Sequence, residues 1–185
     1  YDDIWVRDFA PLQLFKNTKN KYKLYRFKYN GYGKKYGFEK DILFSKSIIT
    51  FYQGINKVIK SHKNIELHEL CEDLAIEGGN IINDGQCLIM NKNPLMVHNN
   101  MSWSEIHPIL EKLFTKNNLN KYYMIDSKGL IGDDTNGHID NLVRIYNDKI
   151  LYMSIEDVNH PNYLNTKDLK RQLQGIIQEP NNFNE

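Results

Sequence analysis

The sequence predicts an α/β domain whose sheet has mixed or antiparallel pairing. Two observations lead to this fold class: segments with strand-like alternation are interleaved with amphipathic helical segments, and several neighbouring strands are joined by short turns. Short turns require antiparallel pairs, so the sheet is not purely parallel. The chain of 185 residues, 41% of them hydrophobic, can bury one sizeable core and shows no linker, so residues 1–185 are expected to form a single domain.

The first half of the chain contains a strand, a long helix and a strand pair. Alternating residues predict a strand over 22–29, which ends at the turn-rich stretch 30–33. Apolar residues recur at helical spacing from 41 to about 62 and predict an amphipathic helix. Residues 74–82 and 87–91 are predicted strands, joined by a turn at 83–86.

A second helix is predicted to begin at Ser102 or Ser104. Ser102 and Glu105 have capping-box spacing, but Ser104 is the better cap because Pro108 then falls in the first turn. The remaining elements are predicted as a strand at 122–125, a loop at 129–141, a hairpin of 143–146 with 150–155, and a helix from near residue 166.

Composition argues against several classes of partner. The net charge of +1 gives no overall field that attracts nucleic acid or a membrane, and the apolar runs are too short to cross a bilayer. Residues 16–40 mix lysine with aromatic residues, as single-strand binders do, but their alternation is explained by a strand with one solvent-exposed face, and nucleic-acid binding is not expected. Only Cys71 and Cys87 are present, which favours a reduced, cytoplasmic setting. The sequence leaves a homo-oligomer open.

The densest polar motif is the run of residues 133–141, which holds three carboxylates, one imidazole and two amides. His138 and Asp140 are two residues apart, so on an extended segment their side chains share a face. An imidazole titrates near neutral pH, and a carboxylate beside it can hold a cation. The pair therefore suits proton transfer to or from a cationic substrate. Less favoured alternatives are a solvated loop and a metal site with these ligands: Asp133, Asp134, His138 and Asp140.

Two further motifs place carboxylates beside unusual backbone. In Trp5-Val6-Arg7-Asp8, Asp8 would hold a cation and Trp5 would lie against its aliphatic stem; taken alone, the motif favours a core tryptophan and a surface Arg7–Asp8 pair. In Glu77-Gly78-Gly79-Asn80, Glu77 follows an apolar stretch and would face the core or a cleft, with glycines that allow close backbone approach. A β-bulge with an exposed Glu77 is an equal alternative.

The three motifs, taken in order, resemble the agmatine deiminase family, which includes the bacterial-type peptidylarginine deiminases and belongs to the guanidine-modifying pentein superfamily. Residues 91–94 and 159–163 look like further landmarks, so the resemblance covers nearly the whole chain. It implies a pentein-type α/β propeller of ββαβ-like units about a pseudo-fivefold axis, with only part of the catalytic domain in this chain.

The resemblance also implies an enzyme without cofactor or metal. It would be a hydrolase that deiminates agmatine to N-carbamoylputrescine and ammonia, a step toward putrescine and polyamines, through a cysteine thiouronium intermediate. By this resemblance, Asp8 and Asp140 would clamp the guanidinium. His138 would be the general acid/base, and Glu77 would orient it. All four would be catalytic residues. Trp5 would flank the substrate.

The family nucleophile is a cysteine near the C-terminus of a longer chain, and neither Cys71 nor Cys87 matches its motif. This chain is therefore expected to carry no nucleophile and to be inactive alone. A peptidylarginine or free arginine deiminase is the nearest alternative activity. More distant alternatives are a non-catalytic pentein binding module and a metal-dependent hydrolase.

Overall fold

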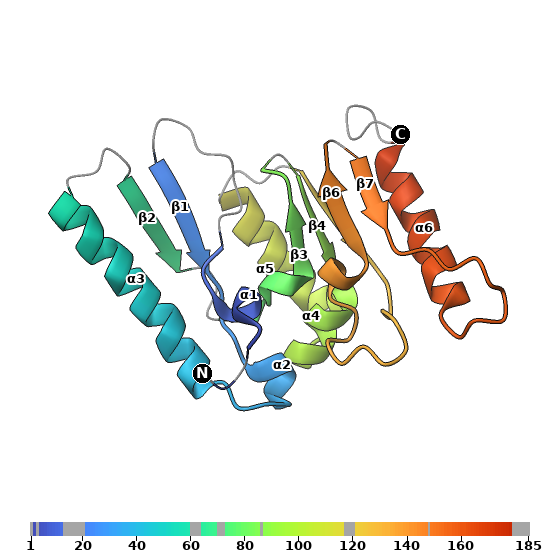
Figure 1. The fold of residues 1–185 in the computed structure, drawn as a ribbon, viewed down its shortest axis with the longest axis horizontal. Coiled ribbons are helices and arrows are strands. Elements are labelled where there is room, and N and C mark those ends of the chain that lie inside the picture. The colour runs from blue at the N-terminus through green and yellow to red at the C-terminus, as the bar shows by residue number, and fades with distance from the viewer. Residues whose placement is uncertain are drawn as a thin grey trace.

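The computed structural model describes residues 2, 4–12, 21–59, 64–69, 73–85, 87–116, 121–147 and 149–178 (Figure 1). Its elements are α1 (Val6–Phe9), β1 (Lys21–Arg26), α2 (Gly31–Lys34), α3 (Glu39–Ile59), β2 (Asn64–Glu69), η1 (Gly78–Asn80), β3 (Ile81–Asn83), β4 (Leu88–Asn91), α4 (Lys92–Asn99), α5 (Trp103–Lys116), β5 (Tyr122–Ile125), η2 (Ile139–Asn141), β6 (Val143–Tyr146), β7 (Lys149–Tyr152) and α6 (Tyr163–Ile177). No described helix has the length and apolar character needed to span a bilayer.

The strands form small sheets with mixed pairing, as predicted. β1 pairs with β2 in parallel, and β6 pairs with β7 as an antiparallel hairpin. The central sheet has the order β3-β4-β5, in which β4 is antiparallel to β3 and parallel to β5. In Figure 1 the β1–β2 pair lies on one side of the central sheet and the β6–β7 hairpin on the other, with α3 and α6 at the two ends.

Strand β4 separates two apolar cores. Side chains alternate across a strand, so Leu88 and Met90 point into the core that contains the buried face of α5, whereas Ile89 points into the core that contains α6. A third cluster is aromatic: Phe9, Tyr29 and Tyr32 pack together, with Phe38 and Phe44 against them. This cluster joins α1, α2 and the first turns of α3.

The predicted strand over 74–82 is wrong in its first part. Ala75 forms only an isolated bridge to Lys28, and the glycine pair then folds into the 3-10 turn η1. The strand itself begins at Ile81. Glycine weakens a strand because it has no side chain to pack, and here the chain turns instead of continuing.

Two helix starts also differ from the prediction. α5 begins at Trp103, and the Ser102 hydroxyl and N–H both contact Glu105 Oε2, at 2.7 and 2.8 Å, so Ser102 is the cap and Ser104 is not. The contacts to Glu105 stabilise this start although Pro108 then lies deeper in the helix. α6 begins at Tyr163 rather than near residue 166. The short helices α1, α2 and α4 were not predicted.

Candidate active site

A cleft of about 460 Å³ opens where α1, α2 and the loop 129–141 meet. Four of the five predicted site residues line it: Trp5, Asp8, His138 and Asp140. The fifth, Glu77, is fully buried behind His138. The rest of the lining consists of Asp2, Tyr32, Tyr36, Asp134, Thr135 and Asn141. Residues from three distant parts of the sequence therefore share one cavity.

Asp8 is the buried carboxylate of the cleft. Its Oδ1 accepts the Gly79 N–H at 2.6 Å, and its Oδ2 accepts the Tyr32 hydroxyl at 2.6 Å. Burial raises the pKa of Asp8, and the nearby His138 together with these two hydrogen bonds opposes that rise. The pocket thus holds a largely desolvated carboxylate at this point, and a bound cation would neutralise it.

The surface Arg7–Asp8 pair considered from the sequence is wrong, and so is the core tryptophan. Arg7 turns away from Asp8, with its Nε 3.6 Å from Asp140 Oδ2 and its Nη2 donating to the Ile81 carbonyl at 2.8 Å. Trp5 is 63% exposed at the rim of the cleft. The helical turn α1 separates consecutive side chains, so Asp8 points inward while Arg7 stays at the surface.

Gly79 lies where the side chains converge. A Cβ at this position would stand 2.5 Å from His138 Nδ1 and 2.6 Å from Asp8 Oδ1, and both distances are shorter than a Cβ tolerates without displacing its neighbour. Any larger residue would therefore displace His138 or Asp8, in keeping with the close backbone approach predicted for this motif. The exposed Glu77 of the β-bulge alternative is wrong, because Glu77 is buried.

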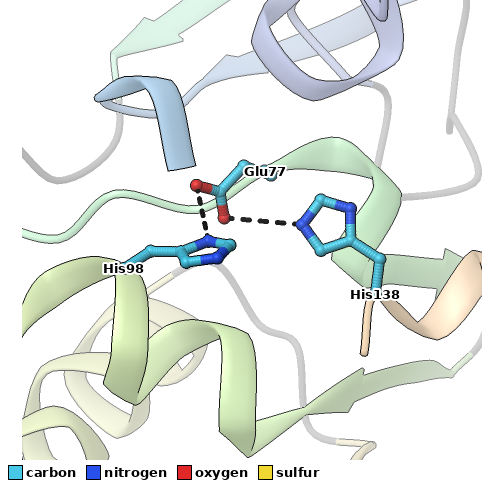
Figure 2. A group of neighbouring side chains, drawn as sticks. All are labelled: Glu77, His98 and His138. Atoms are coloured by element: carbon cyan, nitrogen blue, oxygen red, sulfur yellow. Dashed lines mark hydrogen bonds and ion pairs between the residues drawn. The ribbon is translucent and has the colours of Figure 1, made fainter. Parts of the chain in front are cut away.

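His138 stands between two acidic groups. Its Nδ1 is 3.6 Å from Asp8 Oδ1, and its Nε2 is 3.9 Å from Glu77 Oε2, a contact between charges that is too long for a hydrogen bond (Figure 2). Burial pulls the pKa of His138 down, but the carboxylates of Glu77, Asp8 and Asp140 outweigh it and raise this pKa above its ordinary value. For Glu77, the two neighbouring histidines outweigh the burial penalty and lower its pKa to about 2.

The loop holds His138 and Asp140 differently from the prediction. Residues Ile139–Asn141 form the 3-10 turn η2, so the two side chains do not alternate along an extended segment, although both reach the cleft. Asp133 turns back into the loop, where it accepts bonds from the Thr135 N–H at 2.8 Å and the Gly137 N–H at 2.8 Å. Among the described residues, the donor atoms that cluster closely enough for one metal belong to Glu77, His98 and His138, not to the four-ligand set considered for this loop.

Residues 1–183 match the profile of the Porphyromonas-type peptidyl-arginine deiminases. The chain belongs to this family. Among curated relatives, the agmatine deiminase of Pseudomonas aeruginosa (strain UCBPP-PA14) is 29% identical over 182 residues, covering 94% of this chain and 45% of that protein. The chain thus spans about half the length of the curated relatives that it matches.

Solved structures of the family share the fold. An agmatine deiminase of Enterococcus faecalis superposes with a TM-score of 0.72 at 21% identity, covering 97% of this chain and 47% of the other. The C315S agmatine deiminase of C. jejuni with substrate bound gives a TM-score of 0.70 at 23% identity, covering 97% and 49%. The predicted fold class, part of a pentein-type α/β propeller, is confirmed.

His98 is the residue of this family member's site that the sequence did not reveal. It lies in α4, buried, with Nδ1 3.1 Å from Glu77 Oε1 and Nε2 2.9 Å from Asn136 Nδ2. Its signal is helical spacing: Leu95 and His98 are three apart and share the buried face of α4. Because no helix was predicted over 92–99, that spacing went unused.

Glu77, His98 and His138 offer donor atoms that all lie within 4.8 Å of one another, close enough to face one metal ion. However, both ring nitrogens of His98 already take part in hydrogen bonds, to Glu77 and to Asn136. A metal would have to break one of these bonds to gain this ligand, and we assign none.

Cys87 has the properties of an inert thiol. It is buried before β4, and burial together with Asp84 raises its pKa to about 12. It does not line the cleft. Cys71 lies outside the described residues.

Proposed function

We propose that the full-length protein is a hydrolase that removes ammonia from a guanidinium substrate, with agmatine as the substrate and N-carbamoylputrescine as the product. The supporting observation is that Asp8, Asp140 and His138 open onto one cleft. This arrangement offers negative charge for a flat cation together with a group that can move a proton.

Two carboxylates suit a guanidinium because its N–H groups point outward in a plane, and each acid can accept charge-assisted hydrogen bonds from them. Asp8 already accepts two hydrogen bonds, yet carboxylate oxygens have further lone pairs available. A cation beside Asp8 favours its ionised form and so counteracts the effect of burial. The clamp would fix the central carbon of the guanidinium for attack.

The reaction needs a nucleophile and a proton donor. A thiolate would attack the guanidinium carbon and form a C–S bond; His138 would give its proton to one nitrogen, which leaves as ammonia. Water, losing a proton to the now neutral His138, would then attack the thiouronium carbon and release the carbamoyl product and the thiolate. The raised pKa of His138, held up by its acidic neighbours against burial, supports a protonated imidazole at the first step.

We place the thiolate in the part of the protein beyond this chain. Cys87 is buried with a strongly raised pKa, and the relatives are about twice as long as the matched region. In this assignment the described half supplies the clamp and the proton transfer, and the rest of the protein supplies the sulfur.

The charge of the cleft favours agmatine over arginine. Four aspartates line it, and none of the described lining residues is a lysine or an arginine. Asp2 is paired with Lys40 at 3.5 Å, and the exposed Asp134 accepts from the Tyr36 hydroxyl at 3.1 Å and lies 4.0 Å from Lys35 Nζ. An ammonium tail would be attracted here, and the carboxylate of free arginine would be repelled.

The test is ammonia release by the full-length protein with agmatine, free arginine and a blocked arginine peptide. We expect turnover of agmatine that survives a strong chelator, is abolished by a thiol alkylator, and is protected from the alkylator by agmatine. Loss on chelation with recovery on adding a divalent ion would favour a metal-dependent hydrolase. Preference for the peptide would favour the peptidylarginine alternative, and binding without ammonia from any substrate would overturn the proposal.

A further inference from the structure

His98 is a buried titratable residue that the reaction described above does not use. It lies near the end of α4, and only 3% of its surface is exposed. Figure 2 shows the Glu77 carboxylate between two imidazoles, with one oxygen toward His98 and the other toward His138. The two rings also lie edge to face, with their centroids 6.0 Å apart.

The hydrogen bonds of His98 define where its proton lies. The amide nitrogen of Asn136 can only donate, so the Nε2 atom of His98 accepts this bond. The ring proton is then on Nδ1, from which it is donated to Glu77 Oε1 at 3.1 Å. In this arrangement His98 donates to Oε1 of Glu77, and the other oxygen of the carboxylate faces His138.

The orientation of the Glu77 carboxylate depends on this bond. The Oε2 atom of Glu77 is buried and has no hydrogen-bond partner. The same is true of the His138 Nε2 atom that it faces. Within the described part of the chain, His98 is thus the one residue that hydrogen-bonds to the carboxylate. Without it, a buried carboxylate would rotate or take up a proton.

His98 also connects Glu77 to the loop that carries His138. Asn136, its second partner, precedes His138 by two residues, and the Asn136 carbonyl accepts from Asn93 Nδ2 at 2.7 Å. The backbone of His98 is held in turn, because its carbonyl accepts from Asn30 Nδ2 at 2.8 Å. His98 is thus held by a hydrogen bond at each ring nitrogen and by a third at its backbone carbonyl.

We propose that His98 is a positioning residue: it bridges Asn136 and Glu77, aims the Glu77 carboxylate at His138, and fixes the distance between that pair and the loop. The inference rests on the proposed function for its kinetic consequence, but its hydrogen-bond assignment does not.

The consequence is a pH dependence. The groups that face His138 are Asp8 from α1, Tyr32 from α2, Asp140 from η2, Glu77 before η1 and, across Glu77, His98 from α4. Of these groups, Glu77 is the acid that is hydrogen-bonded to His98. Disturbing His98 should weaken the influence of Glu77 and let burial lower the pKa at which His138 loses its proton.

The experiment compares His98→Leu with His98→Asn in the full-length protein. Leucine removes both bonds at similar bulk, whereas asparagine keeps an N–H donor near the position of Nδ1. We expect His98→Leu to lower kcat for agmatine about tenfold or more and to move the His138 limb of the pH profile down by roughly one unit. His98→Asn should move the limb back toward the wild type. His107→Asn, on α5 outside the cleft lining, is the matched control and should leave the profile unchanged.

An unmoved pH profile in both variants, with activity lost only in proportion to thermal stability, would overturn the inference. A second measurement covers the case in which the leucine variant does not fold: ¹⁵N-histidine NMR of the wild type at neutral pH. We expect the neutral Nδ1–H form of His98, and an Nε2–H form or an imidazolium would overturn the assignment. This measurement needs no substrate, so a wild type inactive on agmatine would overturn the proposed function and leave the His98 result standing.

Discussion

Asp8 Oδ1 accepts the backbone N–H of Gly79 at 2.6 Å, and this bond joins two segments that are 71 residues apart. It is the point at which α1 touches η1. His138 reaches the same point from a third segment, with its Nδ1 3.6 Å from that oxygen. Three chain segments, which carry Asp8, Gly79 and His138, therefore meet at the site, and Gly79 lies at the point where they cross.

The first prediction concerns Gly79→Ala in the full-length protein. The added Cβ would lie 2.5 Å from His138 Nδ1 and 2.6 Å from Asp8 Oδ1, so one of these side chains must move. We expect kcat/KM for agmatine to fall by about a hundredfold or more, because a displacement of about 1 Å costs that much in a preorganised site. Steady-state ammonia release measures it.

Gly175→Ala is the control, since nothing lies within 4 Å of a Cβ at that position in α6. Alanine is a better helix former than glycine, so this variant should be slightly more stable, by up to about 1 kcal/mol, with unchanged activity. Equal activity of the two variants would contradict the crossing described above.

The second prediction concerns His138→Ala. The imidazole is the group in the cleft that can carry a proton between the leaving nitrogen and water, so we expect ammonia release to fall by at least about a hundredfold. Agmatine binding, measured by calorimetry, should weaken far less, because the clamp is made by carboxylates. A rate near that of the wild type would remove His138 from the mechanism.

How far the sequence could go is clearest at Glu77 and His98. The apolar residues before Glu77 and the glycines after it predict a carboxylate near the core, and burial confirms that prediction. His98 has no motif around it, and its partners Glu77 and Asn136 are 21 and 38 residues away. Contacts over such distances depend on tertiary packing, which periodicity does not encode.

The fold shows the same division. Strands β4, β5 and β6 and the α3 helix follow from local alternation and helical spacing, which act within a few residues. The prediction of a strand from residue 74 is wrong because the glycine pair bends the chain under His138. Helix α1 has only four residues, too few to show a period. Local sequence patterns thus predict the main strands and helices, whereas the turns that form the site depend on tertiary contacts.

The third prediction concerns Asp134→Asn. Asp134 lines the cleft at its exposed side, where it accepts from the Tyr36 hydroxyl and lies 4.0 Å from Lys35 Nζ. Its negative charge is expected to attract the ammonium end of agmatine. We expect KM for agmatine to rise several-fold, with little change in kcat, since an exposed charge pair contributes up to about 1 kcal/mol. The ratio of kcat/KM for agmatine to that for arginine should fall.

For comparison, Glu111→Gln removes an exposed acid from α5, away from the cleft lining, and should change neither constant. If Asp134→Asn left the agmatine-to-arginine ratio where it was, the tail of the substrate would have to be recognised elsewhere.

The last prediction is a pH dependence of stability that belongs to Glu77. Its two histidine neighbours outweigh burial and lower its pKa from 4.5 to about 2. Since the pKa is lower in the folded state than in the unfolded state, the ionised carboxylate contributes stability that is present above pH 4.5 and is lost as the pH falls toward 2.

Glutamine has the same shape and does not titrate. Between about pH 6 and pH 3, we therefore expect the free energy of unfolding of the wild type to fall by roughly 1–3 kcal/mol more than that of Glu77→Gln. Urea unfolding of both full-length proteins, followed by fluorescence at several pH values, measures the difference. Parallel curves for the two proteins would mean that Glu77 is not held as an anion against His98 and His138.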